Sequence, residues 1–175
     1  AHLEVRLEDC EGKPAIEDRP QSVEARQEVG HYEGDTMHGA SWEKACVVTV
    51  VERLTGLLLG VKSPDTTVKS VNKVLIRLLR ESPLPVRTLT LDNGTEFHGY
   101  RGVEAATGAK VFFARPHHPW QRGTNENTNG LLRQYWPKRA SMASLSQRQC
   151  NQVAHKINSR PRKRHGYLSP LQLIN

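Results

Sequence analysis

Three acidic residues have types and positions suited to shared metal chemistry: Asp35, Asp92 and Glu126. Asp35 lies toward the end of a short predicted strand at residues 32–37, and Asp92 closes another at 86–91. Magnesium takes hard oxygen ligands and needs only a few protein carboxylates beside substrate phosphate. Two such ions can activate the attacking oxygen and stabilise the leaving oxygen of a phosphodiester displacement. These acids are therefore candidates for a catalytic metal site if the fold brings them together.

Each acid taken alone also fits a solvated surface charge. Asp92 in particular begins an Asp-Asn-Gly sequence, which is typical of a turn. Only a fold that brings the three acids together distinguishes metal binding from this alternative.

The third acid lies on a predicted helix that follows a loop at residues 115–123 and continues to about residue 135. At 100° per residue its apolar side chains lie away from Glu126, with Tyr135 opposite. The face around Glu126 is therefore polar. Its residues are predicted to contact the DNA backbone or a metal-bound water: Arg122, Asn125, Asn129 and Arg133. The alternatives are an i, i+4 ion pair between Arg122 and Glu126 and plain surface positions.

The elements that must position these residues indicate an α/β fold. Strands are predicted at residues 32–37, 45–51, 57–61, 86–91 and 110–114, with the second and third forming an antiparallel hairpin. Helices are predicted from an N-cap at Asp65 to about residue 81, at 100–106, around Glu126, and from a capping box at Ser146 and Gln149 to before Pro161. This order, a mixed sheet flanked by helices on both faces, fits a ribonuclease-H-like fold.

The charge of the chain is divided unevenly. Residues 115–175 contain eleven Lys and Arg and one acid, Glu126, a net charge of +10, whereas the whole chain carries +7. Such a segment is typical of a protein that binds a polyanion with an affinity that falls steeply as salt rises. The densest cluster, predicted to follow a DNA backbone, is Arg160, Arg162, Lys163 and Arg164. The alternative is a solvated basic tail.

The 175 residues fit one domain with a full core. We predict a linker or N-terminal arm at 1–27 and a catalytic domain with a basic C-terminal segment at 28–175. No apolar run approaches the length of a membrane span, so no membrane partner is predicted. Cys10, Cys46 and Cys150 lack metal-site spacing, which favours reduced thiols in a cytoplasmic protein without a zinc site.

Three segments strongly resemble a family of bacterial transposases: residues 30–35, 91–97 and 120–135. The family is insertion-sequence family thirty, of the DDE class. The 33 residues between Asp92 and Glu126 match its D-D-33-E pattern. Residues 158–167 resemble its closing segment and residues 19–26 its lead-in, so the resemblance covers nearly the whole chain. One departure is Tyr32, where Trp is commoner.

This resemblance implies a retroviral integrase-like catalytic core of ribonuclease-H topology. Asp35, Asp92 and Glu126 would bind two Mg²⁺ ions, for which Mn²⁺ can substitute. Water would cleave a phosphodiester at the transposon end, and the freed 3′-OH would attack the target duplex. The implied partners are these DNAs and further copies of the chain, with a dimer favoured, and no small-molecule substrate. The implied place of action is the bacterial cytoplasm, at the nucleoid when on DNA.

Two other functions are compatible with the same fold. One is a structure-selective nuclease that only hydrolyses DNA, and the other is a domesticated, inactive DNA-binding module. Three acids kept among basic residues argue against the inactive module, because DNA binding alone gives no chemical reason to keep them. Joining of a 3′-OH oligonucleotide to plasmid DNA separates the nuclease from the transposase.

Overall fold

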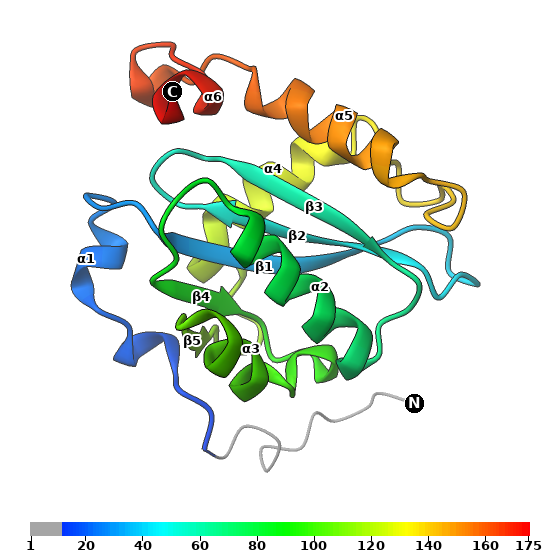
Figure 1. Ribbon diagram of the computed structural model, residues 1–175, viewed down its shortest axis with the longest axis horizontal. Helices are drawn as coiled ribbons and strands as arrows, with labels where there is room; N and C mark the ends of the chain where they lie inside the picture. Colours follow the sequence, from blue (N-terminus) through cyan, green and yellow to red (C-terminus); the bar gives the residue numbers. More distant parts are fainter. Residues whose placement is uncertain (1–11) are drawn as a thin grey trace.

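A computed structural model describes residues 12–175 and contains a five-stranded sheet with helices on both faces (Figure 1). The strands are β1 (His31–His38), β2 (Cys46–Glu52), β3 (Leu58–Ser63), β4 (Thr88–Leu91) and β5 (Lys110–Phe113). Their order is β3-β2-β1-β4-β5. The first three pair antiparallel, whereas β1–β4 and β4–β5 pair parallel. The predicted mixed sheet and the β2–β3 hairpin are confirmed.

Helices cover both faces of this sheet. They are α1 (Gln21–Glu24), α2 (Val68–Glu81), α3 (Tyr100–Thr107), α4 (Gly123–Leu132), α5 (Gln147–Asn158) and α6 (Pro170–Ile174). In Figure 1, α2 and α3 lie in front of the sheet and α4 lies behind it. Short 3-10 turns occur at Ile16–Asp18, Thr95–Phe97, Pro119–Arg122 and Lys163–His165.

Strand β2 shows why both faces must be covered, because every one of its residues is buried. Val48 and Val50 belong to the core under α2 and α3. Val47 and Val51 belong to the core under α4 and α5. Successive strand residues point to opposite faces, so an unbroken apolar run is the pattern of a strand covered twice.

The N-terminus of α2 differs from the prediction. The N-cap is Thr67, whose Oγ1 accepts from the Ser70 N–H at 3.2 Å, and not Asp65. Asp65 instead accepts from the Thr67 N–H at 3.0 Å, which makes it the residue that orients the cap. Val68 is consequently on the exposed side of the first turn, and the buried stripe begins at Val71.

The other helix ends are mostly as predicted. Gly108 closes α3 with φ +75°, a conformation that glycine adopts without strain. The capping box of Ser146 and Gln149 opens α5. The helix α4 ends at Leu132, three residues earlier than predicted, and the chain continues in tighter turns in which the N–H groups of Gln134 and Tyr135 donate to the carbonyls of Leu131 and Leu132.

Residues before β1 pack on the domain. The Phe113 N–H donates to the Pro14 carbonyl at 2.9 Å, and Ala15 pairs with Phe113 as a parallel bridge. Arg19 and Val23 are buried. The division of the chain at residue 27 stays a prediction.

Two further predictions concern the cysteines and the membrane. Cys46 and Cys150 are free and buried, and Cys10 lies outside the described residues. Within residues 12–175 no helix combines the length and apolarity needed to cross a membrane.

Candidate metal and DNA site

The sheet places Asp35 beside Asp92. Strands β1 and β4 run parallel with Glu33 opposite Thr90. Extended by two residues, just past the end of β4, this register places Asp35 next to Asp92, and the charge of Asp92 acts on Asp35. Parallel neighbours present their carboxyl ends at the same edge, which is where open α/β sheets bind ligands.

A single cation lies between these two carboxylates. Arg122, at the entry to α4, approaches Asp92 Oδ2 through Nη2 at 3.3 Å and Asp35 Oδ1 through Nη1 at 3.9 Å. Its Nη1 also donates to the Gly34 carbonyl at 3.0 Å. The two acids therefore share one positive charge, which offsets their mutual repulsion.

Asp35 is the more enclosed of the pair, with 18 % of its side chain exposed against 40 % for Asp92. Burial raises the pKa of the Asp35 carboxyl, and the charge of Asp92 raises it further. Arg122 lowers this pKa, as do the amide of Asn129 and the N–H of Thr36, but they do not cancel the effect of burial. The charged form of Asp35 is therefore not fully stabilised by the shared guanidinium, and a bound divalent cation would stabilise it further.

Asp92 is fixed by the turn that follows β4. Its Oδ1 accepts from the Gly94 N–H at 2.8 Å, a side-chain turn of the kind predicted for Asp-Asn-Gly. Asn93 donates through Nδ2 to the Ala114 carbonyl at 2.6 Å, which ties the corner to the end of β5. Asp92 can therefore serve both as a turn residue and as a metal ligand, because its Oδ1 is used in the turn while its Oδ2 is directed at Arg122.

Helix α4 presents two asparagines to the same place. Asn129 Nδ2 donates to Asp35 Oδ2 at 2.6 Å, and Asn125 Nδ2 donates to the Gly34 carbonyl at 3.2 Å. The side-chain oxygens of both asparagines are buried without a hydrogen-bond donor among the described residues. Such oxygens are costly in a dry interior, and a bound water or cation would satisfy them.

The third predicted acid is not gathered with the other two. Glu126 is exposed on the first turns of α4. Among residues 12–175 no group of three acidic, histidine or cysteine side chains is close enough to hold a metal ion. The structure therefore brings together Asp35, Asp92 and the polar residues around them, and leaves Glu126 one helix turn before Asn129, facing solvent.

A buried ion pair beneath the site was not anticipated. Glu33 lies two residues before Asp35 on the same face of β1 and is completely buried. Its Oε1 pairs with Arg53 Nη1 at 2.5 Å, and its Oε2 accepts from the Asn125 N–H at 2.7 Å. The carboxylate thus fixes the N-terminus of α4, immediately before Glu126. The signal available in the sequence was an acid alternating with Asp35 on one strand.

The remaining predicted DNA contacts are held differently from one another. Arg133 donates to the His38 carbonyl at 2.9 Å, and Arg160 donates to the Tyr135 hydroxyl at 2.8 Å. Arg162 donates through Nη2 to the Ile157 carbonyl at 2.9 Å. Lys163 and Arg164 are exposed on the turn that follows. The basic cluster is therefore an ordered segment packed on the domain, of which Lys163 and Arg164 are the accessible members.

Replacing Arg122 by Gln is expected to strengthen metal binding while it destabilises the metal-free protein. The guanidinium shields the Asp35–Asp92 repulsion and competes for the same oxygens. We expect about 0.5–1 kcal/mol loss of unfolding free energy without metal, and a rise of roughly two- to fivefold in Mn²⁺ affinity. Thermal shift with and without Mn²⁺ measures both, and the exposed Arg148→Gln on α5 is the control. An unchanged response to Mn²⁺ would show that Arg122 does not compete at the acids.

Comparison with known families agrees with this geometry. The model of the integrase core domain family matches residues 25–119. The matched segment includes both aspartates and ends before Glu126.

The chain belongs to the integrase core family.

Two relatives of this chain are transposases of bacterial insertion sequences. The transposase of insertion sequence element IS1086 from Cupriavidus metallidurans is 44 % identical over 161 residues, covering 91 % of this chain and 47 % of that protein. Transposase InsI of element IS30A from Escherichia coli is 37 % identical over 160 residues, covering 91 % and 41 %. The predicted relation to insertion-sequence family thirty is confirmed. This integrase core spans about half the length of the curated relatives it matches.

Solved structures confirm the ribonuclease-H-like fold. The catalytic core domain of BIV integrase superposes with a TM-score of 0.60 at 20 % identity, covering 82 % of this chain and 92 % of that one. A chain of the simian T-cell lymphotropic virus intasome in complex with PP2A regulatory subunit B56 gamma superposes with a TM-score of 0.67 at 17 % identity, covering 83 % and 54 %. At these identities the likeness establishes the fold of this integrase core.

Proposed function

We propose that this integrase core is the catalytic domain of a DNA transposase, which cleaves phosphodiesters at transposon ends and transfers the freed 3′-OH into target DNA. The observation that carries the proposal is the convergence of Asp35 and Asp92, from adjacent parallel strands, on one cation. Transposase relatives over 91 % of the chain supply the substrate class.

The residues present fit a divalent metal. The two carboxylates offer hard oxygen ligands, they already surround a positive charge, and the Asn129 side-chain oxygen beside them is buried without a donor. We propose that Asp35, Asp92 and Glu126 hold two Mg²⁺ ions, for which Mn²⁺ substitutes. When bound, such ions activate the attacking oxygen and stabilise the leaving oxygen of the displacement.

The chain's own residues have separate tasks in this scheme. Asp35 and Asp92 supply the rigid part of the site, because strand register and the turn after β4 fix them. Arg122 leaves the acids when they take metal, and its guanidinium is then free to contact the phosphate. Asn129 holds the Asp35 carboxylate through its amide and orients it.

Glu126 is the mobile member of the proposed set. Its backbone is held one residue away, at Asn125, by the buried Glu33. Its side chain is exposed, so it is free to change rotamer when the loop at residues 115–123 moves. We propose that DNA and metal together recruit Glu126, which keeps the domain inactive when it is off its substrate.

Hydrogen exchange tests this recruitment. Adding duplex DNA with the non-cleaving ion Ca²⁺ is expected to increase amide protection over residues 115–130, because the loop and the first turns of α4 become fixed. The strands β2 and β3 serve as the internal control and keep their protection. Equal and strong protection of residues 115–130 in the free and bound protein would show a preformed site.

The proposed partners follow from the same scheme. They are the two transposon ends and the target duplex, bound by more than one copy of the chain, with a dimer as the smallest unit that handles two ends. We propose that the protein acts in the bacterial cytoplasm, at the nucleoid. Residues 28–175 form the catalytic unit in this proposal, and residues 1–27 form an arm that precedes it.

A joining assay tests the proposed function. A duplex with the terminal sequence of the cognate element and a labelled 3′-OH strand is incubated with plasmid DNA and Mg²⁺. Transfer of the label into plasmid is expected, and it requires the divalent ion. Metal-dependent nicking without transfer, under conditions that support nicking of the same ends, would show a nuclease in place of a transposase.

A further inference from the structure

A cleft lined by positively charged residues lies beside α4, on the side away from Glu126. It has a volume of about 390 Å³ and lies between the start of α4, the β2–β3 turn and the C-terminal basic segment. Every charged residue that lines it is a cation: Arg26, Arg162, Lys163 and Arg164. These residues come from segments more than 130 positions apart, so the cleft exists only in the folded protein.

Two guanidinium groups converge inside this cleft. Arg26 Nη1 donates to the Arg53 carbonyl at 2.7 Å, and Arg164 Nη1 donates to the same carbonyl at 3.3 Å. Arg26 Nη2 donates to Thr124 Oγ1 at 2.7 Å, on the first turn of α4. The Arg53 carbonyl oxygen thus holds together two guanidinium groups that would otherwise repel each other. Each guanidinium keeps further N–H groups that can donate to a ligand.

The local backbone is adapted to this arrangement. Arg26 has φ +48°, a conformation that is strained for a residue other than glycine. Gly56 and Gly123 leave the wall open, and a Cβ on Gly56 would lie 3.1 Å from Arg164 Nη2. Burial lowers the pKa of the Arg26 guanidinium, and the charges of Arg53 and Arg164 lower it further, more than Glu33 and Glu52 raise it. The cleft is a site in which an anion would relieve repulsion.

The ligand of the cleft differs from the phosphate at the acids. The α4 residues that line it are Gly123, Thr124, Asn127 and Thr128. Thr124 and Thr128, whose side chains are buried, lie about 160° around the helix from Glu126. A helix with its side chains is about 10 Å across. One phosphate group therefore does not reach both sites.

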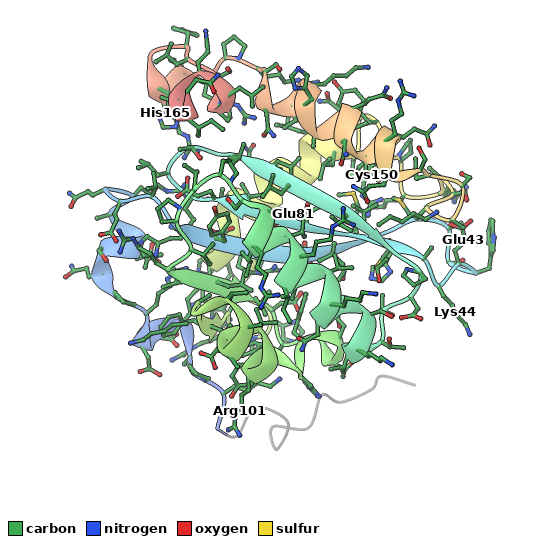
Figure 2. The ribbon with its side chains drawn as sticks, in the orientation of Figure 1. Glu43, Lys44, Glu81, Arg101, Cys150 and His165 are labelled. Carbon is green, nitrogen blue, oxygen red and sulfur yellow. The ribbon has the colours of Figure 1, made fainter. Side chains whose placement is uncertain are left out.

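We propose that this cleft binds a backbone phosphodiester of DNA, at a position separate from the phosphodiester that reacts. The proposal rests on the proposed function, which makes DNA the partner. In Figure 2 His165, next to the basic residues of the cleft, lies at the upper left of the molecule, far from Glu43 and Lys44 at the right. In this proposal the cleft anchors DNA beside the start of α4, apart from the reacting position.

Lys163 offers the cleanest test because its removal disturbs no internal contact. It is exposed, and its ammonium has no hydrogen bond or ion pair to another residue of the part of the chain that the structure describes. Duplex binding is measured by fluorescence anisotropy in EDTA over a series of KCl concentrations. Lys163→Glu is expected to lower the slope of log Kd against log salt by about 0.9, the value for one phosphate contact. The matched control is Lys110→Glu at the exposed start of β5, which should leave the slope unchanged.

Amide shifts locate the contact. Duplex DNA is expected to shift the NMR signals of Gly56 and Gly123, which are far apart in sequence and both line the cleft, and Lys163→Glu should remove both shifts. Equal slopes for Lys163→Glu and Lys110→Glu would overturn the proposal. Shifts produced by inorganic phosphate and not by the duplex would also overturn it, since the cleft would then be a site for a free anion.

The binding measurement is made in EDTA, whereas the joining assay requires a divalent metal, so the two proposals can fail independently. Failure of the cleft to bind DNA, with metal-dependent joining intact, would leave the transposase assignment standing. Failure of joining, with the cleft binding DNA as described, would leave the phosphodiester site standing on a protein without that activity.

Discussion

Substituting Asn for Asp35 or Asp92, or Gln for Glu126, is expected to lower metal-dependent cleavage and joining by at least about a thousandfold, roughly 4 kcal/mol of activation free energy. Each change removes one proposed ligand charge with little change in volume. Activity is measured as transfer of a labelled 3′-OH end into plasmid. Glu81→Gln, on the exposed face of α2 (Figure 2), is the control for loss of one acid and should keep full activity.

Stability separates this loss from unfolding. Because burial raises the pKa of Asp35 above its unfolded value, the folded protein holds that proton more tightly. Its contribution to stability is present at low pH and is lost as pH rises through the folded pKa. At neutral pH, Asp35→Asn should therefore be at least as stable as the parent in a thermal melt. If a variant keeps activity within about tenfold of the parent, the acid that it replaces is not part of the catalytic site.

Replacing Arg53 by Met is expected to cost about 3–5 kcal/mol of unfolding free energy. The substitution leaves the completely buried Glu33 carboxylate without its ion-pair partner, and only the Asn125 N–H remains hydrogen-bonded to it. Urea denaturation measures the loss. A loss below about 1 kcal/mol would show that water or another cation replaces the guanidinium.

A second substitution tests why the pair is there. Adding Glu33→Gln to Arg53→Met should recover most of the stability, because a neutral amide needs no counter-charge while its oxygen still accepts from Asn125. Recovery of joining activity together with stability would support the anchoring of α4 as the role of Glu33. Recovery of stability alone would assign the charge itself a part in the site.

The elements of the sheet were predictable because their signals are local. The apolar run of β2 indicates a strand covered on both faces, and the Asp-Asn-Gly sequence indicates the turn that ends β4. The start of α2 was misplaced because Asp65 and Thr67, two residues apart, both have N-cap chemistry. Only packing of the first turn decides between them.

The site was only partly predictable because its contacts are tertiary. Strand-end positions identified Asp35 and Asp92, but their adjacency depends on the parallel order of β1 and β4. The sequence around Glu33 looks like that of a solvent-exposed acid. Its partner Arg53 lies 20 residues later, directly after β2, so only the folded sheet brings the two charges together. The convergence of Arg26 and Arg164 has no local signal at all.

The most direct test of the proposed metal site is anomalous scattering from crystals of the protein grown with Mn²⁺ and a transposon-end duplex. The expected result is Mn²⁺ at coordination distance, about 2 Å, from the carboxylates of Asp35 and Asp92. Arg122 should be displaced from both acids, and Glu126 turned in to join them. Mn²⁺ bound elsewhere, with Arg122 still between the two aspartates, would contradict the account.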